Sequence, residues 1–145
     1  MKLTSPAFEN NQSIPVKYTC DGEDLSPPLK IAEVPAEAKS LVLIVDDPDA
    51  PVGDWVHWTV LNIPPQTAEI AEGKAPEGLE GKTDFGTPGY GGPCPPGGTH
   101  RYFFKLYALD TKLNLPASAK KADIEKAMED HIITRTELVG IYKRG

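Results

Sequence analysis

Glycine and proline are spread through this chain at a density that restricts it to short elements joined by turns. The 145 residues include 15 Pro and 13 Gly, and these recur at short intervals between runs rich in Val, Ile, Leu, Thr, Tyr and Phe. Ten of the 13 residues in the stretch 86–98 are Gly or Pro, which neither a helix nor a central strand tolerates. The pattern predicts a mainly β fold, either a sandwich or a barrel.

Five apolar runs have the composition of β-strands. In chain order they cover residues 29–31, 40–45, 55–63, 101–109 and 137–142. The runs 40–45 and 55–63 are almost continuously apolar, which is typical of strands buried on both faces. The polar stretch 64–85 is expected to cross the surface without regular structure. With 145 residues, the chain is long enough to bury a core within a single domain, residues 1–145.

One helix is expected, over residues 119–132. Ile124, Ala127, Met128 and His131 recur there at helical spacing and form one apolar stripe. His131 is therefore expected to be a partly buried structural residue.

Charge and hydropathy argue against two classes of partner. The net charge is −6, whereas nucleic acids and anionic membranes attract basic surfaces. The longest aliphatic run, Leu41–Val45, is too short to span a bilayer, and residues 1–6 lack the apolar stretch of a signal peptide. We expect a cytoplasmic protein with no nucleic-acid partner and no integral membrane association.

The two cysteines, Cys20 and Cys94, are too few for a disulfide framework and lack the spacing of metal ligands. Because the cytosol keeps thiols reduced, free thiols are the expectation. A single Cys20–Cys94 bridge is the alternative.

Two distant segments carry polar groups that we expect to meet. The first is residues 46–51 (DDPDAP), followed by His57, and the second is residues 92–102 (GPCPPGGTHRY), which contains His100. Each segment joins a stiff, proline-containing loop to a β-like run. Each also presents one of the chain's three histidines at that junction. The two segments therefore predict a small polar pocket.

The alternation of side chains along a strand predicts how these groups face. Asp47 shares a face with apolar residues of its own run, and Tyr102 shares one with His100. Trp58 is expected to face away from His57 and to belong to the core. A pocket built this way has an apolar floor and a few polar groups at its mouth, as small-molecule sites usually do.

The polar groups suit an anion. A phosphoryl group needs hydrogen-bond donors and some positive charge, and His57 and His100 would supply these with the Tyr102 hydroxyl. Asp47 fits as a partner of an imidazole, because a neighbouring carboxylate favours the protonated ring. We therefore predict an anion pocket whose affinity falls as the pH rises through the histidine range.

The two segments resemble the phosphatidylethanolamine-binding protein family, also called the Raf kinase inhibitor protein family. The resemblance is carried by Asp47-Pro48-Asp49-Ala50-Pro51, by Trp55-Val56-His57-Trp58 and by the segment 92–102, with support from Ser26-Pro27-Pro28-Leu29 and from residues 137–142. The short loop between Pro51 and His57 is similar to that of the bacterial and archaeal branch.

The resemblance implies an antiparallel β-sandwich with Greek-key character and one or two short helices. It also implies a regulatory or inhibitory binding protein for phosphate or phosphoryl head groups, without catalytic activity, cofactor or metal, and it allows a homodimer. The implied ligand-binding residues are Asp47, Pro51, Trp55, His57, Pro95, Pro96, His100 and Tyr102, and the implied supporting residues are Asp49 and Arg101.

Other functions stay open from the sequence. The chain could inhibit a serine protease or a kinase through the stretches 64–85 and 86–98. A hydrolase could use Cys94 with His100. The two histidines and Asp47 could instead hold a metal.

Overall fold

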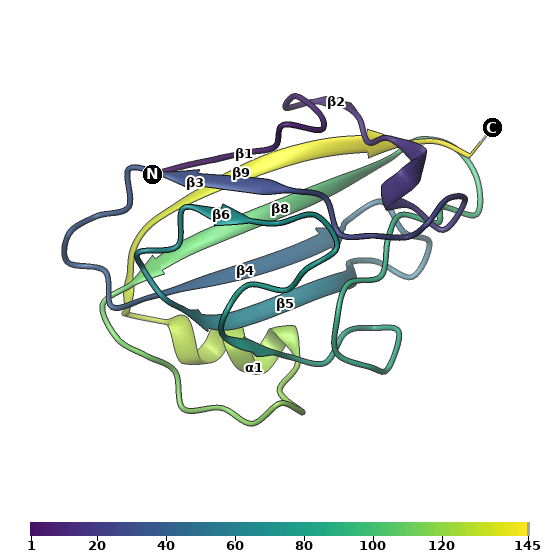
Figure 1. Cartoon of the computed structure of the whole chain (residues 1–145). Helices are drawn as coiled ribbons and strands as arrows, with labels where there is room; N and C mark the ends of the chain where they lie inside the picture. Colours follow the sequence, from purple (N-terminus) through teal and green to yellow (C-terminus); the bar gives the residue numbers. More distant parts are fainter. Residues whose placement is uncertain (145) are drawn as a thin grey trace.

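The computed structural model describes residues 1–144 and consists of two packed β-sheets with one α-helix (Figure 1). The elements are β1 (Lys2–Thr4), β2 (Gln12–Ser13), the 3-10 helix η1 (Val16–Tyr18), β3 (Leu29–Ala32), β4 (Ser40–Asp47), β5 (Trp55–Ile63), β6 (Glu69–Ile70), β7 (Leu79–Glu80), β8 (His100–Leu109), α1 (Lys121–Met128) and β9 (Ile132–Tyr142). The larger sheet has the order β2-β9-β8-β4-β5-β7 and the smaller sheet the order β1-β3-β6. The predicted mainly β sandwich is confirmed.

The larger sheet has the Greek-key order in its centre. β4 and β5 form an antiparallel pair, β7 extends that pair, and β8 returns to lie beside β4 instead of β5. This crossing brings the end of β4, the start of β5 and the start of β8 to the same end of the sheet (Figure 1). The two segments that were expected to meet therefore do meet.

Strand β4 is covered on both faces, as its unbroken apolar run predicts. Between the sheets, Leu43 packs in a cluster that includes Ile31 of β3 and Phe104 of β8. On the other face, Ile44 packs in a second cluster that includes Ile124 of α1. All eight residues of β4 are buried, so the end of this strand is a rigid base for a site.

The helix is shorter than its apolar repeat suggests. It ends at Met128, because Glu129 adopts an extended ψ of 135° and Asp130 has a φ of +66°. His131 consequently lies in the turn before β9 instead of on the helical stripe. Its Nδ1 lies 2.8 Å from Asp110 Oδ1, and its side chain is 45% exposed.

The stretch 64–85 is less irregular than predicted. It contains β6 and β7, each of two residues, which extend the two sheets by pairing with β3 and β5. The stretch 86–98 has no strand or helix, in agreement with its glycine and proline content. None of the helices within residues 1–144 has the length and apolarity needed to cross a membrane.

A break in the register of β5 corrects the predicted orientation of Trp58. Val45 pairs with Trp58, but the next residue, Asp46, pairs with Val56, so that His57 is an extra residue in β5. Such a bulge turns two consecutive side chains toward one face. Both His57 and Trp58 therefore face the smaller sheet, and the prediction that they face opposite ways is wrong.

Candidate binding site

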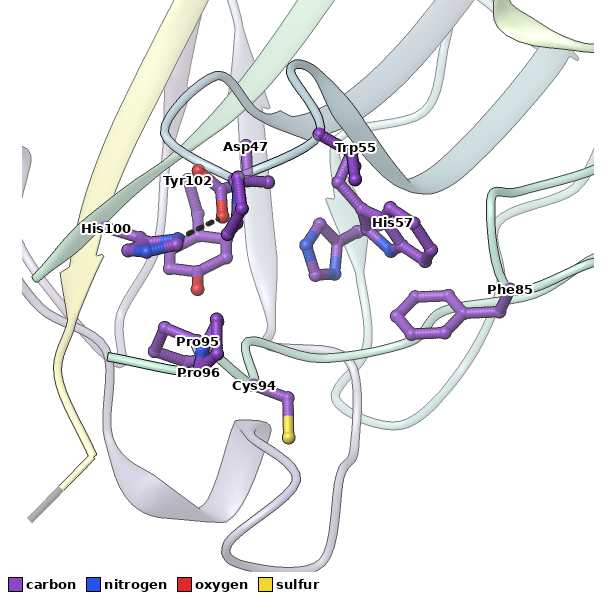
Figure 2. A pocket seen from close by; sticks show the side chains of 12 residues that line it. Asp47, Trp55, His57, Phe85, Cys94, Pro95, Pro96, His100 and Tyr102 are labelled. Atoms are coloured by element: carbon purple, nitrogen blue, oxygen red, sulfur yellow. Dashed lines mark hydrogen bonds and ion pairs between the residues drawn. The ribbon is translucent and has the colours of Figure 1, made fainter. Parts of the chain in front are cut away.

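A cavity of about 270 Å³ opens where β4, β5 and β8 meet the proline-rich loop (Figure 2). Its lining residues are Asp47, Ala50, Pro51, Val52, Trp55, His57, Phe85, Cys94, Pro95, Pro96, His100 and Tyr102. All eight residues predicted as ligand-binding are among them. Their role in binding stays a prediction, but the structure places them around one cavity.

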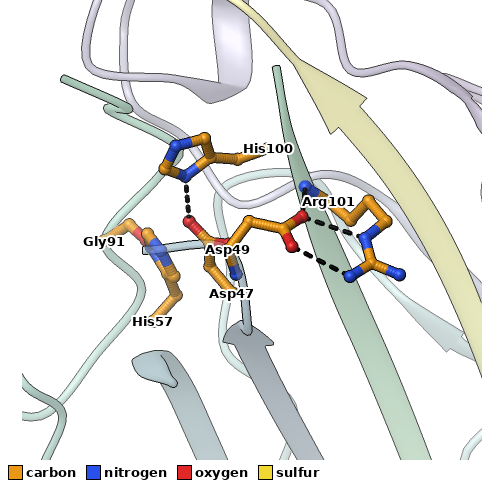
Figure 3. Close-up of polar contacts among 6 residues, drawn as sticks. All are labelled: Asp47, Asp49, His57, Gly91, His100 and Arg101. Atoms are coloured by element: carbon orange, nitrogen blue, oxygen red, sulfur yellow. Dashed lines mark hydrogen bonds and ion pairs between the residues drawn. The ribbon is translucent and has the colours of Figure 1, made fainter. Parts of the chain in front are cut away.

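Asp47 orients the imidazole of His100. The His100 Nδ1 lies 2.6 Å from Asp47 Oδ2, and both side chains are buried (Figure 3). The other carboxylate oxygen of Asp47 accepts the backbone N–H of Asp49 at 2.8 Å. Because Asp47 engages Nδ1, Nε2 is the nitrogen that His100 can offer to a ligand.

A backbone carbonyl orients the second imidazole. The His57 Nδ1 lies 2.6 Å from the carbonyl oxygen of Gly91, and the Gly91 N–H donates to the His57 carbonyl at 3.0 Å. Because a carbonyl only accepts, Nδ1 carries the proton and Nε2 is left for a ligand. Burial lowers the pKa of His57, although the Gly91 carbonyl and the charge of Asp47 oppose this shift. The ring is therefore neutral over most of the physiological range.

Tyr102 supplies a neutral hydroxyl. Its ring is 5.2 Å from that of His57 and 6.5 Å from that of His100, measured between ring centroids. Burial and the charge of Asp47 raise the pKa of Tyr102. The hydroxyl therefore stays protonated and can donate to an anion.

Asp49 and Arg101 hold the loop that follows β4, and their supporting role in binding stays a prediction. Asp49 Oδ2 accepts the backbone N–H and the Nε of Arg101, each at 2.9 Å, and Oδ1 accepts an N–H of the guanidinium at 2.8 Å (Figure 3). These contacts lower the pKa of Asp49 to about 2. The charge of Arg101 is thus neutralised outside the cavity, whose lining contains no Lys or Arg.

Pro95 and Pro96 form one side of the cavity, the proline wall. A disulfide between Cys20 and Cys94 links this wall to the segment that follows η1, so the expectation of free thiols is wrong. The turns after η1 and before β8 bring the two Cα atoms to 5.4 Å. The backbone N–H of Cys20 also donates to the Pro93 carbonyl at 3.1 Å. Because its sulfur is bonded, Cys94 is not available as the nucleophile of a hydrolase.

The metal-site alternative also lacks the required geometry. Within residues 1–144, no three His, Cys, Asp or Glu side chains are grouped so that they could hold a metal ion. Asp47 instead engages His100, and His57 engages the backbone of Gly91.

Four lining residues were not predicted as ligand-binding: Ala50, Val52, Phe85 and Cys94. Phe85 is the one that lies farthest along the chain from the two predicted segments. Its ring lies edge-on to Trp55 and His57, with centroid distances of 5.6 and 5.4 Å. Phe85 is 47% exposed, and Val52, which also lines the cavity, is 77% exposed. In the sequence, only its position as a single aromatic residue in the polar stretch 64–85 could have indicated Phe85. Together these residues give the cavity an apolar rim over a polar floor, so the predicted apolar floor with polar groups at the mouth is wrong.

The fold is a β-sandwich with a cavity lined by residues of its central strands, and comparison with known proteins places it in a family. The family model described as phosphatidylethanolamine-binding protein matches residues 4–143. The chain belongs to the phosphatidylethanolamine-binding protein family.

Two archaeal relatives share about half of the residues. A UPF0098 protein of Methanothermobacter thermautotrophicus is 52% identical, with complete coverage (100%) of both chains. A UPF0098 protein of Pyrococcus horikoshii is 53% identical over 97% of this chain and 75% of that protein.

Two crystal structures have the same fold. A phosphatidylethanolamine-binding protein homologue from Chlamydia trachomatis has a TM-score of 0.96 and 45% identity, covering 99% of this chain and 97% of that chain. YbcL of E. coli, described as a new member of the mammalian family, has a TM-score of 0.92 and 32% identity, covering 99% and 98%.

Proposed function

We propose that this chain binds small anions that carry a phosphoryl group, and that the cavity is the binding site. One observation carries the proposal. The Nδ1 atoms of His57 and His100 are both engaged by acceptors of the protein, so that their Nε2 atoms are left for a ligand in the same cavity as the Tyr102 hydroxyl. When protonated, both imidazoles can donate through Nε2, and together with the Tyr102 hydroxyl they can bind one oxyanion.

The same cavity favours binding over catalysis. Its lining contains no Ser, Thr or Lys, and its one cysteine is in a disulfide. The raised pKa of Tyr102 makes that hydroxyl a poor nucleophile. We therefore propose a regulatory role, in which occupancy changes the surface that the surrounding loops present to a partner.

Anion affinity is expected to rise as the pH falls from 8 to 6. Burial lowers the pKa of free His57, whereas a bound anion stabilises the imidazolium and raises it. Between these two pKa values, binding takes up a proton, so a lower pH favours the complex. Below the pKa of the free ring, His57 is already charged, and its contribution becomes constant.

Histidine-observed NMR tests the proposal. Phosphate, phosphorylethanolamine and sulfate are titrated at about pH 6 and pH 8, and sulfate serves as the control because its charge is constant in this range. We expect the signals of His57 and His100 to shift at pH 6, that of His131 to stay in place, and His57→Ala and His100→Ala to remove one responding signal each. A response confined to His131, or equal sulfate affinity at both pH values, would contradict this assignment.

The apolar rim predicts a preference for anions with an apolar group. Phe85→Ala is expected to weaken phenyl phosphate binding about three- to tenfold, because a partly exposed aromatic contact contributes roughly 1 kcal/mol. Inorganic phosphate does not reach the rim, so its affinity is expected to change less than about twofold. Calorimetric titration of both ligands checks the difference, and equal losses for both would show that Phe85 acts only by supporting His57.

Inhibition of a protein partner through the surface is the second candidate function. The exposure of Val52 and Phe85 beside the cavity favours it, because exposed apolar side chains gather at protein contact sites. Inhibition of a protease or kinase that persists in the variant lacking both His57 and His100 imidazoles would separate surface inhibition from ligand-dependent regulation.

A further inference from the structure

The loop 48–54 forms one wall of the cavity, through Ala50, Pro51 and Val52. Asp47 and Trp55 flank this loop at its two ends, and both also line the cavity. A change in the separation of the loop ends would therefore move the wall and both flanking side chains together.

A lysine on the opposite side of the sheet bridges the two ends of this loop. Lys121, the first residue of α1, places its Nζ 2.7 Å from Asp46 Oδ2 and 3.2 Å from Asp54 Oδ2. Asp46 immediately precedes Asp47, and Asp54 immediately precedes Trp55. One ammonium group thus joins the side chains of the residues at the two ends of the loop.

Asp46 is a strong anchor for this bridge. It is fully buried, and its Oδ2 also lies 3.0 Å from Lys105 Nζ, whereas its Oδ1 has no hydrogen-bond partner within residues 1–144. A buried carboxylate depends on its cations, because removing one leaves charge uncompensated. Lys121 also contacts Asp54, a contact that Lys105 does not share within the described chain.

Lys121 is held in place by the packing of its helix. Ile124 and Met128 of α1 are buried in the second core cluster, with Val42 and Ile44 of β4. Burial lowers the pKa of Lys121, but the contacts with Asp46 and Asp54 outweigh this effect and raise it to about 12. The bridge is therefore permanently charged, and its position is set by the core.

We propose that Lys121 is a positioning residue for the anion pocket, which it supports from the far face of the sheet by fixing the two ends of the loop 48–54. The proposal rests on the proposed anion-binding function and specifies how α1, which does not line the cavity, contributes to the site. Rigid placement of the flanking Asp47 and Trp55 is what the bridge supplies, because binding groups must be held in geometry by the residues around them.

Four variants test the bridge. Lys121→Met removes it, Asp54→Asn removes only its contact with the loop end, and Lys121→Arg retains a cation that can reach both carboxylates. Lys105→Met is the matched control, because it also takes one cation from Asp46 and leaves the Asp54 contact intact. Phosphate affinity, the indole N–H NMR signal of Trp55 in the ligand-free protein, and unfolding in denaturant are measured for each.

We expect Lys121→Met to weaken phosphate binding about tenfold and Asp54→Asn about threefold, since small displacements of a site cost large factors in affinity. Both should shift the ligand-free Trp55 signal, Lys121→Arg should restore most of the affinity, and Lys105→Met should change affinity less than about twofold. Similar losses of stability in the two lysine-to-methionine variants would show that stability does not explain the difference.

Two outcomes separate this proposal from the proposed function. If the wild-type protein does not bind phosphate, the anion-binding function fails, and the Trp55 signal alone decides whether Lys121 positions the loop. If wild type binds but Lys121→Met and Asp54→Asn match Lys105→Met in affinity and in the Trp55 signal, the bridge is only structural and the proposal is overturned.

Discussion

Removal of the Cys20–Cys94 disulfide is expected to lower the free energy of unfolding by about 4 kcal/mol. The bond joins residues with a sequence separation of 74, and a cross-link over such a distance removes about 4 kcal/mol of chain entropy from the unfolded state at 25 °C. Both cysteines are exposed, so Cys20→Ala with Cys94→Ala leaves no cavity in the core. Urea unfolding of the oxidised wild type and the double variant measures the difference.

Reduction provides the matched control for this prediction. A thiol reductant should bring the wild type to the stability of the double variant and leave the variant unchanged. The proline wall keeps other contacts, since the N–H of Gly92 donates to Asp24 Oδ1 at 2.9 Å and that of Cys20 to the Pro93 carbonyl. We therefore expect phosphate affinity to fall less than about threefold. Equal urea midpoints for the wild type and the variant would contradict the entropic account.

The parts of the fold that depend on apolar patterning could be predicted from the sequence. The continuous apolar run of 40–45 predicted a strand covered on both faces, and β4 is such a strand. It extends to Asp47 because the buried Asp46 and Asp47 have a lysine and a histidine partner, respectively, that compensate their charge. A local pattern cannot show such partners, which come from β8 and α1.

The composition of the site was predictable because its residues lie on two proline-containing segments. Features that depend on how segments meet were not. The disulfide needs two turns to place Cys20 beside Cys94, and Phe85 reaches the rim from a stretch that has no strand pattern. The bulge at His57 depends on pairing between β4 and β5, and strict alternation therefore gave the wrong orientation for Trp58.

A large loss of stability is expected when Trp58 is replaced. The side chain is 1% exposed, its ring lies edge-on to that of Tyr90 at 5.5 Å, and its Nε1 donates to Glu80 Oε2 at 2.8 Å. Trp58→Ala should lower the free energy of unfolding by about 3–5 kcal/mol, the usual range for a buried aromatic residue. The substitution should leave the amide NMR signals of the α1 residues nearly unchanged, because the bulge directs Trp58 away from the face of the sheet that α1 covers.

Trp55→Ala is the control, because the two tryptophans lie three residues apart on β5 and differ in their surroundings. Trp55 is only partly buried, at the cavity rim against Phe85, so its removal should cost about 1 kcal/mol of stability and weaken phenyl phosphate binding. Denaturant unfolding and ligand titration of both variants should thus separate a core residue from a site residue. Without the bulge, Trp58 would face α1, and Trp58→Ala would perturb the helix signals first. That result would overturn the observed register and the placement of His57 in the cavity.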